Sequence, residues 1–481
     1  MMTQTQALAT LAREDPDAAG DARAALAWLA GDDGLGTISL LRLQEFLWYA
    51  LPVKWPMTTD AQVGVARALG RVLMLAGMDR YAGVCDSPRT ERIITSYADG
   101  HEEGIAAYTE AIDASNAAPP DTELLAWGSV MGPQERAAYD ACAAALELAF
   151  AAGELSVGAR GWRTRRLDLV NRWLTSQSLD ASDTWLSRIS AERIDAWARG
   201  RSGDRSRLAR AVIPRLLEPP AIPDDPLPTL SWLLDQASDG VRLTARHYIA
   251  PAVVTEAVNA FGWRDKLVGS LRTELDVFPL HTLRGMAQKD MGALRRSKAS
   301  LVLTGTGKLM AADPSVRWHI GTAALIGSDD GPHPDFSAAV REAALLMILT
   351  SSHQLSYEDM TSALTEIHIA EGWAQGDSPR DGGVGGRVSG SPDGRGDGPR
   401  NAQRGAGAPS PRDPRAKETT ALANAVRTEL YNLRHRLWAL HLLGSERTSG
   451  ARISLTDDGV AAALSALLAR ALRPRHHLPA A

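Results

Sequence analysis

Cysteine, lysine and long apolar runs are all scarce in this chain of 481 residues. The two cysteines, Cys85 and Cys142, are too few for a disulfide framework or a cysteine-based metal site, so a reducing compartment is expected. The most apolar run, Ala141 to Ala152, is interrupted by Glu147 and is too short to cross a bilayer. No basic residue precedes Arg13, and the N-terminus has no apolar core of signal-peptide length. These absences predict a soluble, cytoplasmic protein without a membrane partner.

The motifs of familiar catalytic sites are missing as well. Neither His-Glu-x-x-His nor Gly-x-Ser-x-Gly occurs in the chain. The segment from Thr304 to Lys308 has the glycines and the lysine of a phosphate loop. Such a loop also needs glycine at position 302 and Ser or Thr at 309, where this chain has Val302 and Leu309. The sequence therefore provides no catalytic, cofactor-binding or metal-binding residues, and it favours a protein that is not an enzyme.

Charge is distributed unevenly around the net value of −5. Residues 1–150 contain 10 basic and 21 acidic side chains, a net charge of −11. Residues 242–308 contain 11 basic and 5 acidic side chains, a net charge of +6. A basic segment inside an acidic chain favours contact with nucleic acid, although a solvated basic face without a partner explains the same charges. The acidic N-terminal half is a candidate surface for a protein partner.

Helical periodicity dominates the chain, and breaks in composition divide it. Prolines crowd between Leu217 and Pro228, which predicts a boundary, and residues 375–417 are rich in Gly, Pro, Ser and Arg with almost no large apolar residue. The predicted fold is mainly α, with a helical domain followed by two winged-helix-like modules that contain short β-hairpins. The predicted order is a flexible tail (1–20), an acidic helical domain (21–217), a Pro-rich boundary (218–228), a winged-helix-like module with further helices (229–374), a disordered insertion (375–417) that interrupts a module, and a C-terminal winged-helix-like module (418–481).

The winged-helix prediction depends on residues 294–310. Leu301-Val302-Leu303 alternates like a strand, and Leu294-Arg295-Arg296 is expected to pair with it across the turn 297–300. Thr304 then occupies the N-cap position of a following helix. A helix, a basic hairpin and a Thr-capped helix in this order indicate the wing of a winged-helix module.

The same junction recurs twice in the sequence. Leu303-Thr304-x-x-Gly307 matches Leu455-Thr456-x-x-Gly459, and Val241 to Thr244 is a weaker copy with His247 in place of glycine. Glycine in the first turn of a helix costs up to ~1 kcal/mol relative to alanine. Its presence in two copies predicts that another group packs too closely there for a Cβ. A common strand-to-helix junction without a wing is the alternative.

A candidate DNA-binding surface follows from the same segment. A helix is expected to start at Pro251, a second to span Arg264 to Leu275, and a third to precede the hairpin with its apolar side inward at Leu280, Leu283, Ala287 and Leu294. The third helix would enter the major groove, and the hairpin cations would contact phosphate. The predicted contact residues are His281, Arg284, Gln288 and Lys289 on the helix, and Arg295, Arg296 and Lys298 on the wing. A helix that faces a protein is the competing interpretation.

A heptad-like seam runs along residues 422–440. Its apolar residues alternate at spacings of four and three: Leu422, Val426, Leu430, Leu433, Leu437 and Leu440. This pattern is typical of core packing, and otherwise of a homodimer contact.

Aromatic motifs suggest a family resemblance. The clearest reads Phe46-Leu47-Trp48-Tyr49-x-Leu51-Pro52-x-Lys54-Trp55, and shorter ones are Arg80-Tyr81-Ala82, Pro120-Asp121-Thr122, Trp127, Met131-Gly132 and Gly161-Trp162-Arg163. These resemble the signature of a set of uncharacterised actinomycete proteins, and the central Leu-Thr and wing pattern is similar to plasmid-type open-reading-frame-3 family proteins. The resemblance implies no activity and no catalytic residues. The expected function is DNA binding, in a regulatory role or linked to a mobile element; the alternative is a protein-interaction scaffold that binds no nucleic acid.

Overall fold

The computed structural model describes residues 2–31, 34–177, 182–327, 336–351, 355–373, 414–444 and 452–476. The chain is mainly helical, as predicted, and it divides into two compact units. Unit 1 consists of Met1–Glu192 and Pro474–His477, and unit 2 of Arg193–Arg473 and Leu478–Ala481. Within the described ranges, no helix combines the length and the apolar character that a membrane crossing requires.

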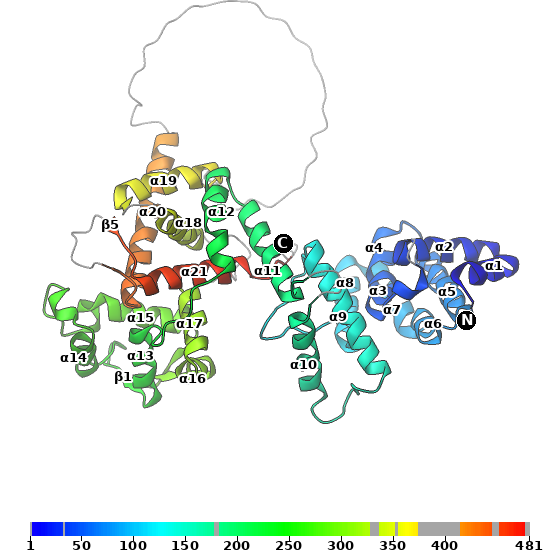
Figure 1. The fold of residues 1–481 in the computed structure, drawn as a ribbon, viewed down its shortest axis with the longest axis horizontal. Helices are drawn as coiled ribbons and strands as arrows, with labels where there is room; N and C mark the ends of the chain where they lie inside the picture. The colour runs from blue at the N-terminus through cyan, green and yellow to red at the C-terminus, as the bar shows by residue number, and fades with distance from the viewer. Residues whose placement is uncertain are drawn as a thin grey trace, which may run out of the picture. The chain divides into compact units, whose positions relative to one another are not determined.

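Unit 1 is built from helices around two apolar cores, one formed by residues 7–111 and the other by residues 125–189. Its helices are α1 (Gln4–Glu14), α2 (Pro16–Ala30), η1 (Leu35–Thr37), α3 (Leu40–Glu45), η2 (Phe46–Ala50), α4 (Leu51–Lys54), α5 (Thr59–Leu75), α6 (Asp79–Cys85), α7 (Pro88–Asp99), α8 (His101–Ser115), α9 (Pro133–Ala151) and α10 (Trp162–Thr175), as Figure 1 shows. The following helix, α11 (Trp185–Arg199), crosses the division between the units.

The prediction of a loose tail over residues 1–20 is wrong. Thr3 caps α1 through a reciprocal box in which Thr3 and Gln6 bond each other's backbone N–H groups. Ala7 and Leu11 are fully buried in the first core. The helix forms because its cap is complete and its apolar side has a surface to pack against.

The aromatic signature at residues 46–55 forms part of the first core. It runs through the π-helical turn η2 and the short helix α4, and it buries Phe46, Leu47 and Trp48. The indole Nε1 of Trp48 donates a hydrogen bond to the Thr90 hydroxyl at 2.8 Å, so the buried ring has a polar partner. Core packing accounts for these aromatic residues.

The predicted boundary at residues 218–228 is also wrong. The division falls in α11, between Glu192 and Arg193. The helix that precedes the prolines, α12 (Gly203–Leu217), belongs to unit 2, where Val212 and Leu216 are buried in its core. The prolines form a loop inside unit 2, because prolines prevent a regular helix without preventing the chain on either side from packing together.

Unit 2 contains helices and short strands around one continuous core. After α12 they are α13 (Pro228–Ser238), β1 (Val241–Arg242), α14 (Pro251–Ala260), η3 (Trp263–Asp265), η4 (Glu274–Asp276), α15 (Phe278–Lys289), β2 (Leu294–Ser297), β3 (Ser300–Leu303), α16 (Gly305–Ala312), α17 (Pro314–Ala323), α18 (Phe336–Thr350), β4 (Leu355–Ser356), α19 (Tyr357–Ala370), α20 (Pro414–Ala439), β5 (Arg452–Ile453) and α21 (Asp457–Ala471). The helix expected over 264–275 is absent from this segment, which forms the 3₁₀ turns η3 and η4 with a loop between them.

The predicted hairpin at residues 294–303 is confirmed. Strands β2 and β3 pair antiparallel, with Leu294 opposite Leu303 and Arg296 opposite Leu301. Lys298 lies in the tight turn with a φ of 53°. Strand β1 adds to the free side of β3, which gives the order β1-β3-β2. Leu294, Leu301 and Val241 are buried and anchor the small sheet on the core.

Two Thr-capped junctions after β3 and β5 have the same geometry. The hydroxyl of Thr304 accepts a hydrogen bond from Gly307 N–H at 3.1 Å, and that of Thr456 from Gly459 N–H at 2.9 Å. A Cβ on Gly307 would lie 2.1 Å from the Ala293 carbonyl oxygen, and one on Gly459 would lie 2.2 Å from the Leu442 oxygen. Backbone of the preceding segment therefore passes too close for a side chain, which is the reason predicted for both glycines.

This close approach makes Gly307 intolerant of substitution. Gly307→Ala is expected to lower the free energy of unfolding by roughly 1–3 kcal/mol, because the clash is with backbone that is fixed on both sides. Gly305→Ala is the matched control, since a Cβ there meets nothing within 4 Å and alanine is the better helix former. Urea unfolding of the two variants measures the difference. A Gly307→Ala protein as stable as Gly305→Ala would contradict the packing argument.

The other two predicted ribbons need correction. Strand β5 pairs with β4, the strand that precedes α19. Leu455, just after β5, forms an isolated bridge with Leu443. The turn expected at 449–450 lies outside the described residues. At the weaker copy, Thr244 caps no helix. It closes a turn in which His247 has a φ of 65°, and α14 begins later, at Pro251. The predicted disorder over 375–417 also falls outside the described residues, except that 414–417 start α20.

The seam on α20 is occupied within the chain. Its six apolar residues, Leu422 to Leu440, are all buried in the core of unit 2. Helix α20 packs against α15, α18 and α19, and Phe278 of α15 places its ring 4.6 Å from that of Trp438. The seam residues are therefore part of the core of unit 2 and are not exposed for a homodimer contact.

Candidate nucleic-acid interface

Helix α15 has an apolar face that packs in the core of unit 2 and an opposite face that is polar and partly exposed to solvent. Leu280, Leu283 and Ala287 are fully buried, as predicted, and Asp290 at the C-terminal end forms an ion pair with Arg436 of α20 at 2.9 Å. On the other side lie His281, Thr282, Gly285, Gln288 and Lys289, of which His281 and Lys289 are exposed and the rest half-buried. Open space surrounds the position of a Cβ on Gly285. The exposed face is polar, and Gly285 leaves it without a side chain at its centre.

A buried carboxylate holds α15 against the segment before α14. Glu274 is 0% exposed, and its two oxygens accept hydrogen bonds from the Ile249 N–H, from His281 Nδ1 at 2.8 Å and from Arg284 Nη1 at 2.8 Å. A charged carboxylate only accepts, so His281 carries its proton on Nδ1. Burial by itself raises the pKa of Glu274, but the bonds from His281, Ile249 and Arg284 outweigh it and leave the pKa lowered.

This arrangement removes Arg284 from the outward-facing set. Its side chain is only 13% exposed, and its Nε donates to the Gln288 amide oxygen at 3.0 Å. Arg284 therefore positions α15 and is not free to contact a ligand. The prediction that Arg284 faces outward is wrong because Glu274, its partner, lies in a stretch that was expected to be helical. Sequence alone did not indicate that the two side chains meet.

The cations of the β2–β3 hairpin are exposed. Arg295 and Arg296 are neighbours on β2, so their side chains leave opposite faces of the ribbon, and Lys298 lies at its tip. Within the described residues, none of the three has an ion-pair partner. Arg242 on β1, opposite Ser300, and Arg246 in the following turn are exposed too and extend the basic surface beyond the predicted set. Because Ala293 N–H bonds the Ala287 carbonyl, the ribbon starts directly at the end of α15.

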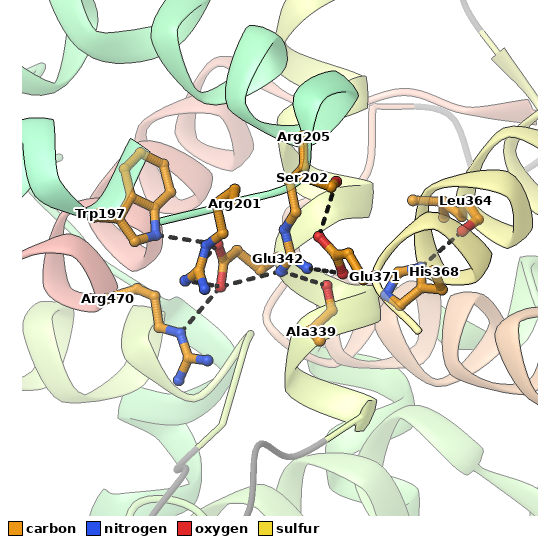
Figure 2. Close-up of polar contacts among 10 residues, drawn as sticks. All are labelled: Trp197, Arg201, Ser202, Arg205, Ala339, Glu342, Leu364, His368, Glu371 and Arg470. Atoms are coloured by element: carbon orange, nitrogen blue, oxygen red, sulfur yellow. Dashed lines mark hydrogen bonds and ion pairs between the residues drawn. The ribbon is translucent and has the colours of Figure 1, made fainter. Parts of the chain in front are cut away.

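A second polar cluster was not expected from the sequence. Glu342 of α18 is 0% exposed and forms ion pairs with Arg201, Arg205 and Arg470 (Figure 2). Glu371 forms an ion pair with Arg205 and accepts a hydrogen bond from the Ser202 hydroxyl. Arg205 lies in α12, and Arg201 and Ser202 lie just before it. Glu342 lies in α18, Glu371 directly follows α19, and Arg470 lies in α21. No sequence motif joins residues so far apart, so only the three-dimensional structure reveals the cluster.

Comparison of the chain with protein-family profiles, curated proteins and solved structures found no match. The family resemblance noted for the aromatic motifs stays a prediction.

Proposed function

We propose that the segment from α13 to β3 is a winged-helix module and that the protein binds DNA through it. The elements run helix, strand, helix, helix, hairpin, and the first strand lies beside the last. That order and pairing match the winged-helix arrangement, in which the third helix enters the major groove and the hairpin contacts the backbone. In this interpretation α15 is the third helix and β2–β3 is the wing.

A second copy of this order supports the proposal. Helix α18, strand β4 and helices α19 and α20 are followed by β5, which pairs with β4, and Leu455 just after β5 bridges Leu443. The third helix of this second copy, α20, is packed between α15, α18 and α19, so we assign DNA contact to α15 and its wing.

The observation that carries the proposal is the set of exposed cations Arg295, Arg296 and Lys298, for which the described part of the chain contains no ion-pair partner. Cations on both faces and at the tip of a narrow ribbon suit a wing that lies along phosphates. Of the helix residues, His281, Gln288 and Lys289 are the candidates for base contact: His281 bonds Glu274 only through Nδ1 and Gln288 bonds Arg284 only through its amide oxygen, so each keeps a polar nitrogen. Arg284 is only 13% exposed and its charge is engaged by Glu274. A regulatory role, or one linked to a mobile element, is consistent with such a module but depends on the DNA sequence that it recognises.

Salt dependence tests the proposal. Each phosphate contact contributes about −0.9 to the slope of log K against log[salt]. Changing Arg295, Arg296 and Lys298 together to Ala is therefore expected to reduce the steepness of that slope by about 2 to 3, measured by fluorescence anisotropy on a labelled duplex between about 50 and 200 mM salt.

A charge-matched control separates wing contact from net charge. Arg89, Arg92 and Arg163 are exposed in unit 1, and changing them to Ala removes the same charge. That variant should keep the wild-type slope. An equal slope in the wing variant, or no binding by the wild type, would sink the DNA proposal and favour a protein-interaction scaffold, with the acidic N-terminal half as the first surface to probe.

A further inference from the structure

The outward face of α15 presents hydrogen-bonding groups of two kinds. His281 and Gln288 are seven residues apart, so they lie about two turns apart on the same side of the helix. Each side chain is held at one atom by a contact within unit 2, and each keeps a nitrogen without a partner among the described residues. The two contacts determine whether the remaining nitrogen donates or accepts a hydrogen bond.

At His281 the remaining nitrogen is an acceptor. Its Nδ1 bonds Glu274 Oε1 at 2.8 Å, and an ionised carboxylate can only accept, so the imidazole proton lies on Nδ1. In the neutral imidazole, Nε2 then has a free lone pair. The Tyr248 ring flanks the imidazole with its centroid 6.4 Å away, and the His281 side chain is 51% exposed. A ligand group that meets Nε2 must therefore donate a hydrogen bond.

At Gln288 the remaining nitrogen is a donor. The Nε of Arg284 can only donate, and it bonds the Gln288 amide oxygen at 3.0 Å. The oxygen is thus turned toward Arg284, and the amide nitrogen, with its two N–H groups, is the end left for a ligand. Lys289, the next residue, is exposed and also carries only donors. This end of the face suits a ligand edge that accepts hydrogen bonds.

Gly285 lies between these two groups on the same side of the helix. A Cβ at this position would meet no atom within 4 Å, so packing within the chain does not explain the glycine. Glycine is also a poor residue for the interior of a helix. Close approach of a base-pair edge does explain it, because any side chain here would project between His281 and Gln288.

We propose that α15 reads two base pairs of opposite chemistry. His281 Nε2 accepts from the exocyclic amine of adenine or cytosine, and Gln288 Nε2 donates to guanine. In the major groove those two bases present the amines, and guanine presents two acceptors, N7 and O6, without a donor. Residues seven apart on a helix in the groove contact bases about two to three steps apart. This inference rests on the DNA-binding proposal and assigns base identities to its site.

Selection of bound duplexes from a randomised pool at pH 8, which favours the neutral imidazole, tests the inference. The aligned wild-type sites should show one column of A or C and, about two to three base pairs away, one G·C pair in a fixed orientation. His281→Ala should lose only the first column. Gln288→Glu should keep the first column and invert the G·C pair, because glutamate accepts from cytosine N4.

Gly285→Leu tests the close approach. It should weaken binding to the selected duplex by at least about fivefold, and binding to a random duplex by less, because the new side chain separates both groups from the bases. Gly20→Leu is the control, since Gly20 lies inside α2 of unit 1 and a Cβ there also meets nothing within 4 Å. Thermal unfolding checks that both variants are folded, and if Gly285→Leu is not, the two column tests still decide.

The failure of this inference differs from the failure of DNA binding. A pool without enriched columns, selected by a wild-type protein that binds DNA with a steep salt slope, would overturn the base assignment and leave the DNA proposal standing. Columns that respond to neither His281→Ala nor Gln288→Glu would do the same. A wild-type protein that binds no duplex at low salt would overturn both.

Discussion

Glu342→Gln is expected to lower the free energy of unfolding of unit 2 by about 3–5 kcal/mol. The amide has the same shape as the carboxylate, so packing around α18 is preserved and the Trp197 bond can persist. The loss is electrostatic, because Arg201, Arg205 and Arg470 would face a neutral group at a side-chain position that is 0% exposed. Breaking one side of a buried ion pair is costly for this reason, even where the whole pair adds little.

Guanidinium-induced unfolding, followed by circular dichroism, measures the effect of Glu342→Gln. Asp195→Asn is the control, since it breaks an exposed pair with Arg199 and should change stability by less than about 1 kcal/mol. If Glu342→Gln were as stable as Asp195→Asn, the cluster would be a screened surface network and the buried-charge argument would fail.

The same substitution should change the response to acid. Burial opposes the charged form of Glu342, but Arg205, Arg201 and Arg470 outweigh it, so the pKa is lowered in the folded state. The stabilisation is therefore complete above the ordinary glutamate pKa of about 4.3 and is lost as the pH falls through the lower folded-state value. Glu342→Gln should remove this part of the acid dependence, and the stability difference from wild type should narrow below about pH 4.

Short-range features of this chain were predictable because their causes lie within a few residues. Leu301 and Leu303 alternate, Thr304 can bond only the first turn after it, and Gly307 stands where a Cβ would strike the Ala293 carbonyl. The exposure of Arg295, Arg296 and Lys298 follows from the same short ribbon. One stretch of sequence was therefore enough to predict the hairpin.

Features that depend on distant partners were not predictable from composition or periodicity. Arg284 has the helical position of an outward residue, but a buried carboxylate ten residues earlier engages it. Proline crowding at 218–228 marks a loop, whereas the division between units depends on which helices pack together, and α12 packs with α18 and α21. Arg201, Glu342 and Arg470 likewise meet only in the folded chain.

Glu274→Gln is expected to destabilise unit 2 by about 3 kcal/mol and to loosen α15. Glu274 joins the Ile249 backbone to His281 and Arg284, so its charge sets the orientation of the helix relative to the wing. The amide keeps one accepting oxygen and places an NH2 group where the other oxygen stood, so either His281 or Arg284 with the Ile249 N–H loses its acceptor. The Arg284 guanidinium, only 13% exposed, then faces a neutral group. Asp265→Asn is the control in the neighbouring 3₁₀ turn η3, where the side chain is exposed and has no ion-pair partner among the described residues, so little change is expected.

This variant also separates the contributions of the helix and the wing to DNA binding. The cations at Arg295, Arg296 and Lys298 are untouched by Glu274→Gln, so the salt slope should stay at its wild-type value. Preference for one DNA sequence over a random duplex should fall, because base contacts from His281, Gln288 and Lys289 require a fixed α15. Anisotropy titrations with a selected and a random duplex measure both quantities. A changed slope with unchanged preference would assign sequence reading to the wing and remove α15 from the interface.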